Sequence, residues 1–259
     1  MYHSIYIFLI AFIVRILNLH LNEINADTYL IEDQLMYWDW SLNNAFTPNG
    51  LVDPKLLLER MPGSFLFFQF AIWIVGDDLF RILVIQIIID SLTCLIIAFI
   101  AKTLNKSFFI LAGIVSAFSP LMIIISSQIL SDTIFLFFFS ISILSILNFS
   151  KYKKERFIYL GAIFLSLALF TRAVVLPFIF LIPILIFYIC YKEKHSVLKI
   201  IKITSIFFII ALSFATPRII NNYYNFNTLS LTSQSGAHLA YWVLPAILDF
   251  DSEKKKSTV

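Results

Sequence analysis

Long apolar runs separated by short clusters of charged residues make up most of the 259-residue chain. A helix needs about 20 apolar residues to cross the hydrocarbon core of a bilayer, so the runs predict about seven membrane spans. The predicted spans lie near residues 4–21, 80–102, 107–126, 132–149, 157–172, 174–191 and 200–217. The expected fold class is therefore all-α, a polytopic transmembrane helical bundle, with a break between the fifth and sixth spans marked by Thr171-Arg172 and Pro177.

Two shorter stretches between the first two predicted spans have a different pattern. Ser64–Val75 is apolar but too brief to span, which favours a segment that lies at the interface or re-enters the membrane. Asp33–Ala45 interleaves apolar and aromatic residues with polar ones. That pattern predicts a helix lying in the interface, with the aromatic side chains of Tyr37 and its neighbours at the level of the lipid headgroups.

The composition supports lipid as a solvent for this chain. Hydrophobic residues make up 60% of it and charged residues only 14%, and a soluble domain of this length could not cover so much apolar surface. The net charge is +3, and its lysines and arginines do not gather on one face, so nucleic-acid binding has little support. Both cysteines fall inside apolar runs, which favours simple packing over a disulfide or a metal site.

Loop charges predict the orientation. One set of loops contains the lysine and arginine clusters at 102–106, 151–156 and 192–202. The positive-inside rule places these loops and the N-terminus in the cytoplasm, as in a protein of a bacterial plasma (inner) membrane. We therefore expect a helical domain over residues 1–217, whose first loop at 22–79 faces outward, followed by an outward-facing segment at 218–259.

Short motifs spread along the chain resemble, in the same order, those of one superfamily of membrane enzymes. They are Asp33-Gln-Leu-Met-Tyr37, Arg60-Met-Pro62-Gly63, Gln86 with Asp90-Ser91, Ser119-Pro120 with Ser131-Asp132, Leu167–Arg172, and Pro217 with Asn222-Tyr223. The superfamily is the GT-C membrane glycosyltransferases. Within it, the chain is most similar to the dolichyl-phosphate-mannose–protein mannosyltransferases and the bacterial aminoarabinose transferases.

The chain departs from that pattern in two ways. Where the family has W-x-x-R-N-Y, this sequence has Arg218 followed by Ile-Ile-Asn-Asn-Tyr, so Asn221 takes the place of the family's arginine. The family also usually continues for several more helices. We therefore expect this chain to be a truncated relative, a fragment, or one piece of a split protein.

The resemblance implies an inverting glycosyltransferase that moves a sugar from a polyprenyl-phosphate-linked donor to an acceptor at the extracytoplasmic face. The acceptor class, whether protein, lipid or glycan, stays open. By the family's pattern, Asp33 is the expected general base. Asp132 is the expected second carboxylate, which orients the acceptor or binds a cation, while a helix N-cap at Ser131-Asp132 is an equally good interpretation.

The expected substrate-binding residues are mainly cationic. Arg60 is the first candidate for a phosphate clamp, because a guanidinium matches phosphate oxygens bidentately. Arg172 is the second, with snorkelling to lipid headgroups as its alternative. Glu59 is a further acid or a partner of Arg60, and Tyr37 and Arg218 complete the set as members of the motifs. No cofactor is predicted with certainty, and a divalent cation held by Asp33 and outer-loop oxygens remains an alternative.

Polar residues inside the spans raise a separate question. Gln86 and Asp90 are four residues apart on one helix face, and Arg15 is the expected kind of partner. An intramembrane acid suggests function, yet interhelical hydrogen bonding is the interpretation that we favour here.

A second class of function is also compatible with the sequence: a non-catalytic membrane protein that binds lipid phosphate, transports, or serves as an assembly subunit. The enzymatic hypothesis predicts that Asp33, Arg60, Asp132 and Arg172 converge on one outward cavity, and scattered positions would favour the non-catalytic one.

Overall fold

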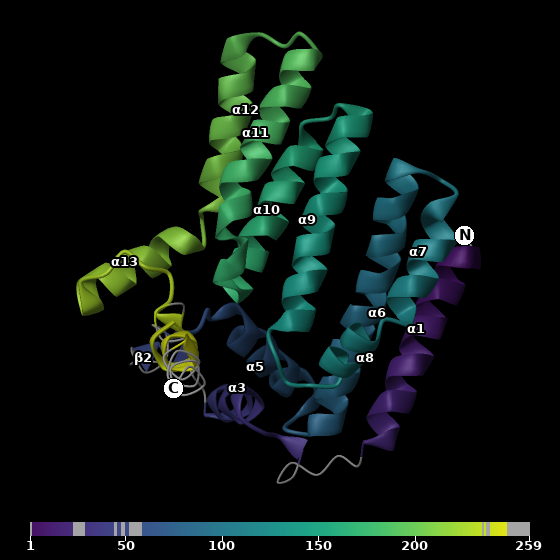
Figure 1. Ribbon diagram of the computed structural model, residues 1–259, viewed down its shortest axis with the longest axis vertical. Helices are drawn as coiled ribbons and strands as arrows, with labels where there is room; N and C mark the ends of the chain where they lie inside the picture. Colours follow the sequence, from purple (N-terminus) through teal and green to yellow (C-terminus); the bar gives the residue numbers. More distant parts are fainter. Residues whose placement is uncertain are drawn as a thin grey trace, which may run out of the picture.

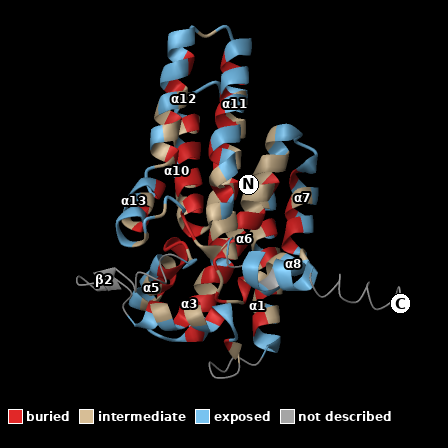
Figure 2. Ribbon diagram, turned by 60° about the vertical axis from the view of Figure 1, so that its left-hand side comes forward, coloured by how far each residue is buried: buried red, intermediate tan, exposed pale blue. Residues whose placement is uncertain are grey.

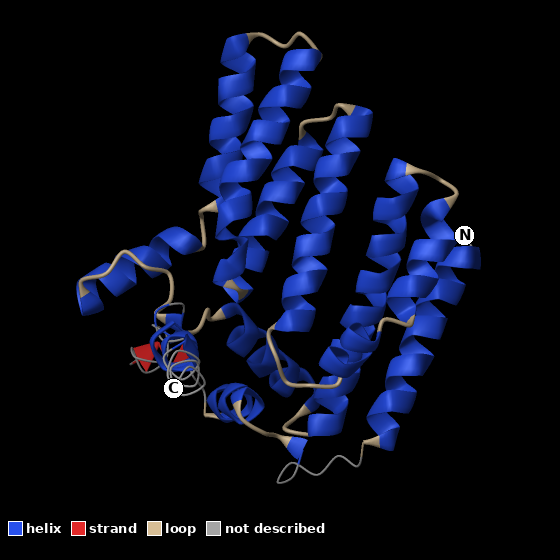
Figure 3. Ribbon diagram, in the orientation of Figure 1, coloured by secondary structure: helices blue, strands red, loops and turns tan. Residues whose placement is uncertain are grey.

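The computed structural model describes residues 2–22, 29–43, 46–47, 50–51, 59–234, 236 and 239–247. Helices form nearly all of the regular structure in this part of the chain, which confirms the all-α fold class (Figure 3). The N-terminal elements are α1 (Tyr2–Leu21), α3 (Asp33–Leu42), α5 (Gly63–Val75), α6 (Leu79–Leu104), α7 (Phe108–Ala117) and α8 (Pro120–Ser126). The C-terminal elements are α9 (Asp132–Tyr152), α10 (Arg156–Thr171), η1 (Ala173–Val175), α11 (Leu176–Lys192), α12 (Val197–Ala211), α13 (Ala215–Phe226) and η2 (Leu239–Val243). One antiparallel pair, β1 (Phe46–Thr47) with β2 (Gly50–Leu51), is two residues long on each side.

The helices form two neighbouring groups (Figure 1). In one group α9 packs on α10, and α12 packs on both α10 and α11; in the other, α1, α6 and α7 contact one another. The contact between α6 and α9 joins the groups. Buried residues lie along the inner faces of the helices and exposed ones along the outer faces (Figure 2). Many of the exposed residues are large and apolar. That distribution is the one expected of a bundle whose outer surface meets lipid.

The two ends of the bundle differ. The connections α6–α7, α9–α10 and α11–α12, which contain the lysine clusters, lie at the upper end in Figure 1. At the lower end α3 and α5 lie across the bundle and pack on each other, and α8 contacts α1, α6 and α9. The segments predicted from loop charge to share a side therefore do share an end of the molecule.

The predicted spans coincide with helices, but their lengths differ from the expectation of about seven straight crossings. In the described part of the chain, four helices are long and apolar enough to cross a membrane, or up to six if each bent pair is one span. The predicted span at 157–172 is α10, which has only 16 residues. Its end at Thr171, the irregular Arg172 and the start of α11 beside Pro177 confirm the break predicted there.

Two predicted single spans are wrong as continuous helices. The stretch 107–126 is divided into α7 and α8, which are bent by 53°, and the stretch 200–217 is divided between α12 and α13, bent by 54°. The first break has a clear cause, because Pro120 at the start of α8 has no N–H to donate to the preceding turn. A break in hydrocarbon leaves backbone carbonyls that the protein itself must pair.

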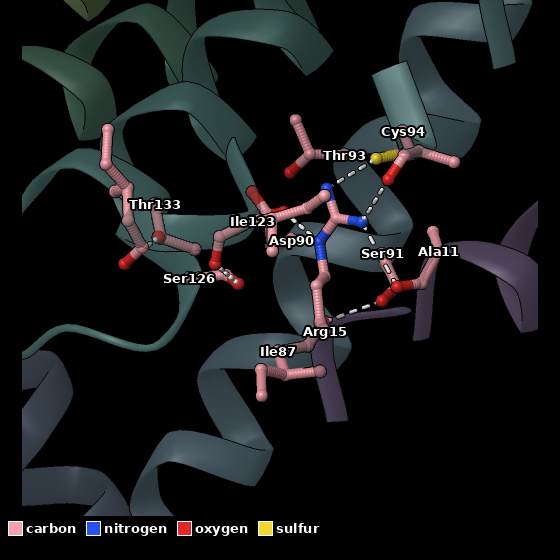
Figure 4. A network of polar contacts seen from close by, with 12 residues as sticks. Ala11, Arg15, Ile87, Asp90, Ser91, Thr93, Cys94, Ile123, Ser126 and Thr133 are labelled. Atoms are coloured by element: carbon pink, nitrogen blue, oxygen red, sulfur yellow. Dashed lines mark hydrogen bonds and ion pairs between the residues drawn. The ribbon is translucent and has the colours of Figure 1, made fainter. Parts of the chain in front are cut away.

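Arg15 of α1 supplies the donors at the α7–α8 break. Its side chain is fully buried; Nη1 donates to the carbonyl of Ala117, the last residue of α7, at 3.0 Å, and Nη2 donates to Sγ of Cys94 at 3.1 Å. Nε donates to the carboxylate of Asp90 on α6 (Figure 4). The predicted pairing of Arg15 with Asp90 is thus present.

Gln86, one turn before Asp90 on α6, serves the other end of the broken segment. Its Nε2 lies within hydrogen-bond distance of the carbonyl oxygens of Ile125 (3.2 Å), Ser126 (3.0 Å) and Gln128 (2.6 Å). These carbonyls lie at or just past the end of α8, where the helical ladder stops. Those of Ile125 and Gln128 also accept backbone hydrogen bonds from the turn that follows. The geometry favours the structural interpretation of the intramembrane polar residues.

We expect loss of one partner of the buried pair to destabilise the fold strongly. Asp90→Leu leaves the guanidinium of Arg15 buried without its counter-charge, which should lower the free energy of unfolding by about 3–5 kcal/mol. The double variant Arg15→Met, Asp90→Leu should lose less, about 1–3 kcal/mol, because no charge stays buried and only neutral acceptors, the carbonyl of Ala117 and Sγ of Cys94, lose their donor. Unfolding of the purified protein in detergent micelles measures both. Equal stability of Asp90→Leu and wild type would contradict the structural role.

Candidate functional site

Helix α3 is fixed at the lower end by aromatic packing against α5. The ring of Tyr37 stacks on Phe65 with centroids 4.8 Å apart, and the ring of Trp40 lies 4.5 Å from the same phenylalanine. Phe65 is fully buried, and Tyr37 is nearly so. On the neighbouring face of α3, the side-chain oxygen of Gln34 accepts a hydrogen bond from the backbone of Ile129. The helix is thus attached both to α5 and to the loop that leads into α9.

The first ion pair of the site joins Asp33 to Arg60. Nη2 of Arg60 lies 2.8 Å from each carboxylate oxygen of Asp33. Asp33 is the first residue of α3, where the helix dipole favours a negative charge. Half of the Asp33 side chain (51%) is exposed, against 19% for Arg60, so the carboxylate is open to solvent while the guanidinium lies deeper.

The second ion pair joins Asp132 to Arg172. Asp132 begins α9 and Arg172 follows the last residue of α10, and the two antiparallel helices bring these ends together. Ser131 occupies the N-cap position of α9 but makes no capping hydrogen bond with its side chain. The helix start predicted at Ser131-Asp132 is therefore confirmed, without a side-chain capping hydrogen bond. The alternative prediction for Arg172 was snorkelling to lipid headgroups. In the structure its guanidinium pairs with Asp132, and its Cζ lies 5.9 Å from the ring centroid of Phe135.

Both arginines line one cavity of about 500 Å³. Its wall comes from α3, the segment before α5, the ends of α9, α10 and α11, and the stretch after α13. The lining residues are Tyr37, Arg60, Met61, Ser131, Thr171, Arg172, Ala173, Val174, Leu176, Pro177, Ser230, Leu231, Thr232 and Gln234. Apolar residues such as Leu176 and Pro177 stand beside the arginines, so the cavity combines two cations with an apolar side.

Tyr37 connects the two ion pairs. Its side chain lines the cavity together with Ser131, the residue before Asp132, and the charges of both Arg60 and Arg172 act on its phenol. Burial is the largest influence, and it raises the pKa of Tyr37 above its ordinary value of 10.0. The phenol is therefore neutral at physiological pH, so it can donate a hydrogen bond into the cavity.

Gly63 allows the Arg60 segment to approach Arg172. A Cβ atom at Gly63 would lie 2.7 Å from the carbonyl oxygen of Phe170 and 2.9 Å from Cγ2 of Thr171. Only a residue without a side chain lets α5 begin against the end of α10. The close contact places Arg60, three residues earlier, on the same cavity as Arg172.

Of the four residues chosen as the geometric test, Arg60 and Arg172 line one cavity, whereas Asp33 and Asp132 are not among its lining residues and reach it only through their ion pairs with these arginines. Glu59 does not pair with Arg60 in this structure, because Asp33 takes that place, and the Glu59 side chain is exposed. Arg218 is buried behind the cavity wall rather than on it. Sequence reasoning missed Ser131 as a lining residue of the cavity, the close approach of Gly63, and the wall segment 230–234.

The described residues contain no group of three or more His, Cys, Asp or Glu that could hold a metal ion. The expected ligand Asp33 is engaged by Arg60. Much of the outer loop that was expected to supply further oxygens lies outside the described residues.

Fold and site together define a polytopic membrane protein with a cationic, partly apolar cavity at one end of a helical bundle. The model of the dolichyl-phosphate-mannose-protein mannosyltransferase family matches residues 59–220, well over half of the chain. The chain belongs to this family of GT-C membrane glycosyltransferases, which confirms the resemblance seen in the motifs. The matched region includes Arg60, Asp132, Arg172 and Arg218 and begins after Asp33. No curated protein and no solved structure matches the chain.

We expect Gly63→Ala to destabilise the protein, because its methyl group would overlap the backbone of Phe170. Overpacking of this kind typically lowers the free energy of unfolding by about 1–3 kcal/mol. Gly236→Ala is the matched control, since a Cβ there meets no atom within 4 Å, and its effect should stay within about 0.5 kcal/mol. Detergent-solubilised variants can be compared by thermal unfolding, and equal stability of the two would contradict the close approach.

Proposed function

We propose that this protein transfers a sugar from a polyprenyl-phosphate-linked donor to an acceptor at the extracytoplasmic face, with inversion at the anomeric carbon. One observation carries the proposal: Arg60 and Arg172, each paired with an aspartate, line the same cavity beside an apolar surface. The family uses polyprenyl-phosphate-linked sugar donors in general. Family membership by itself supports a membrane glycosyltransferase. The donor, the inversion and the membrane side assigned to this chain are part of the proposal.

The two arginines suit a phosphate that carries the sugar and then leaves with negative charge. A guanidinium binds phosphate oxygens through a planar pair of donors, and fixed positive charge lowers the energy of the leaving group as its charge develops. The apolar residues beside them, Leu176 and Pro177 among others, would hold the first part of the polyprenyl chain. Tyr37 would hydrogen-bond to a phosphate or sugar oxygen.

Asp33 is the proposed general base. The acceptor oxygen attacks C1 of the sugar from the face opposite the phosphate and forms the new glycosidic bond. The C1–O bond to phosphate breaks, its electron pair stays on the phosphate oxygen, and the acceptor's proton passes to the Asp33 carboxylate. Asp33 is half exposed, so an acceptor can reach it from outside the membrane. Asp132 would orient the acceptor or hold Arg172 in place.

The orientation proposed from loop charge fits the position of the cavity. The lysine-rich connections lie at one end of the bundle and α3 and α5 at the other (Figure 1). With the lysine-rich end in the cytoplasm, the cavity opens on the outer side. A transporter would need polar groups aligned across the spans, yet Arg15 and Asp90 bond to each other and Gln86 bonds to carbonyls.

We expect Asp33→Asn to lower the rate of sugar transfer by about 10²- to 10⁴-fold, since a positioned base contributes that much. Stability should change by less than about 1 kcal/mol, because exposed ion pairs contribute little to folding. Asp39→Asn is the matched control: it is an exposed aspartate on the same helix, and its activity should stay near wild type. The assay measures labelled sugar leaving a polyprenyl-phosphate donor in reconstituted membranes.

Full turnover of Asp33→Asn would show that the assigned base is wrong. A wild-type protein that binds polyprenyl phosphate but transfers no sugar to any acceptor would instead favour the non-catalytic membrane protein.

We expect Arg60→Ala to weaken use of the lipid donor. Loss of a charge-assisted contact to phosphate should raise the donor KM by about tenfold or more. The control is Arg81→Ala, because Arg81 is an exposed arginine paired with Asp78 at the start of α6 and does not line the cavity. Steady-state kinetics at varied donor concentration separates the two, and an unchanged donor KM in Arg60→Ala would contradict the phosphate clamp.

A further inference from the structure

Helix α13 buries two of its polar side chains, Arg218 and Asn222, and exposes several apolar and aromatic ones. It leaves α12 at a bend of 54° and extends sideways from the lower part of the bundle (Figure 1). Arg218 and Asn222 are buried, at 5% and 0% exposure, while Tyr223 and Tyr224 are exposed. The buried residues are four apart and so share one face of the helix. Burying an arginine and an asparagine costs free energy unless their polar atoms find hydrogen-bond partners.

Those hydrogen bonds connect α13 to the cavity wall. Nδ2 of Asn222 donates to the carbonyls of Ser230 (2.8 Å) and Leu231 (3.2 Å). Nε of Arg218 donates to the carbonyl of Leu231 at 3.2 Å. Both Ser230 and Leu231 line the cavity, so the two side chains of α13 hold one part of its wall from behind.

Arg218 also reaches the proposed phosphate clamp. Its Nη2 donates to the backbone carbonyl of Arg60 at 3.2 Å, across 158 residues of sequence. One guanidinium therefore fixes the wall at Leu231 and the backbone that carries the Arg60 side chain. The planar, rigid fork of arginine can set the distance between two such acceptors, whereas the single ammonium of lysine cannot.

We propose that Arg218 and Asn222, the α13 polar pair, are positioning residues for the donor site, and this rests on the proposed function. They act through the backbone of Arg60 and the wall at 230–232, and they do not touch the donor themselves. Arg218 Nη1 and Asn222 Oδ1 are buried and make no hydrogen bond among the described residues. Incompletely paired buried polar groups lower stability, so stability alone does not account for the α13 polar pair. Its hydrogen bonds to the cavity wall and to the backbone of Arg60 do account for it.

The test compares Asn222→Ala with Asn225→Ala in the purified full chain. Asn225 is on the same helix but exposed, and its side chain bonds only to Asn221. We expect Asn222→Ala to raise amide hydrogen exchange in residues 230–234 by about tenfold, because buried hydrogen bonds that hold the wall are lost. Asn225→Ala should leave exchange in this segment unchanged.

Ligand binding and kinetics separate a positioning role from a merely structural one. Asn222→Ala should weaken binding of polyprenyl phosphate and raise the donor KM by about tenfold, with kcat changed little, since ground-state and transition-state binding fall together. Arg218→Lys should behave in the same way, because it keeps the charge but loses the fork. A direct phosphate contact by Arg218 would instead weaken donor binding in Arg218→Lys while leaving amide exchange in residues 230–234 unchanged.

Wild-type donor KM and exchange in both Asn222→Ala and Arg218→Lys would overturn the proposal. If Asn222→Ala fails to fold, Arg218→Lys decides alone, by the same two measurements. The outcome is distinguishable from failure of the proposed function: a wild type that neither binds polyprenyl phosphate nor transfers sugar overturns the function, whereas the exchange measurement still reports whether the α13 polar pair holds the wall.

Discussion

In hydrocarbon every backbone N–H and C=O must find its partner inside the protein, and this constraint organises the whole molecule. The α7–α8 break is tolerated because Arg15 pairs the carbonyl of Ala117. At the far end of α8, Gln86 does the same for the carbonyls of 125, 126 and 128. Arg15 is on α1 and Gln86 is on α6, and the two helices pack against each other. Asp90 of α6 supplies the negative charge that allows Arg15 to be buried between them. The loop that follows α8 then leads directly to Ser131 and Asp132.

The candidate site is built from helix ends as a result. Asp33 and Asp132 each occupy the first turn of a helix, where the dipole favours a carboxylate, and Arg172 follows the end of another, where it favours a cation. Arg60 stands just before α5. Chemistry-bearing residues gather where helices stop because only there does the chain leave the apolar interior. The same ends are the places where segments distant in sequence can meet.

The fold class could be predicted from the sequence, because an apolar run of about 20 residues in a bilayer satisfies its backbone hydrogen bonds as a helix. The sequence did not predict the bends. The stretch around Ser119-Pro120 is mostly apolar and was therefore predicted as one span, although Pro120 marks the break. The α12–α13 bend falls at Leu212–Phe214, before Pro217, with no proline or glycine of its own. The motifs identified Asp33, Arg60, Asp132 and Arg172 one at a time. Which aspartate pairs with which arginine depends on tertiary contacts such as that of Gly63 with Phe170. Such contacts leave no local pattern in the sequence.

Of the four Arg–Asp ion pairs among the described residues, the three apart from Arg81–Asp78 have the same chemistry and differ in burial, and that difference separates their roles. The Arg15–Asp90 pair is almost completely buried (0% and 2%), so removing one partner leaves a charge in hydrocarbon and costs several kcal/mol, about 3–5. The pairs Arg60–Asp33 and Arg172–Asp132 are partly exposed and contribute about 0–1 kcal/mol each. An arginine held so weakly can exchange a carboxylate for a phosphate oxygen at little cost. Under the proposed function, that exchange would free Asp33 to accept a proton when the donor is bound, which links donor binding to the activation of the acceptor.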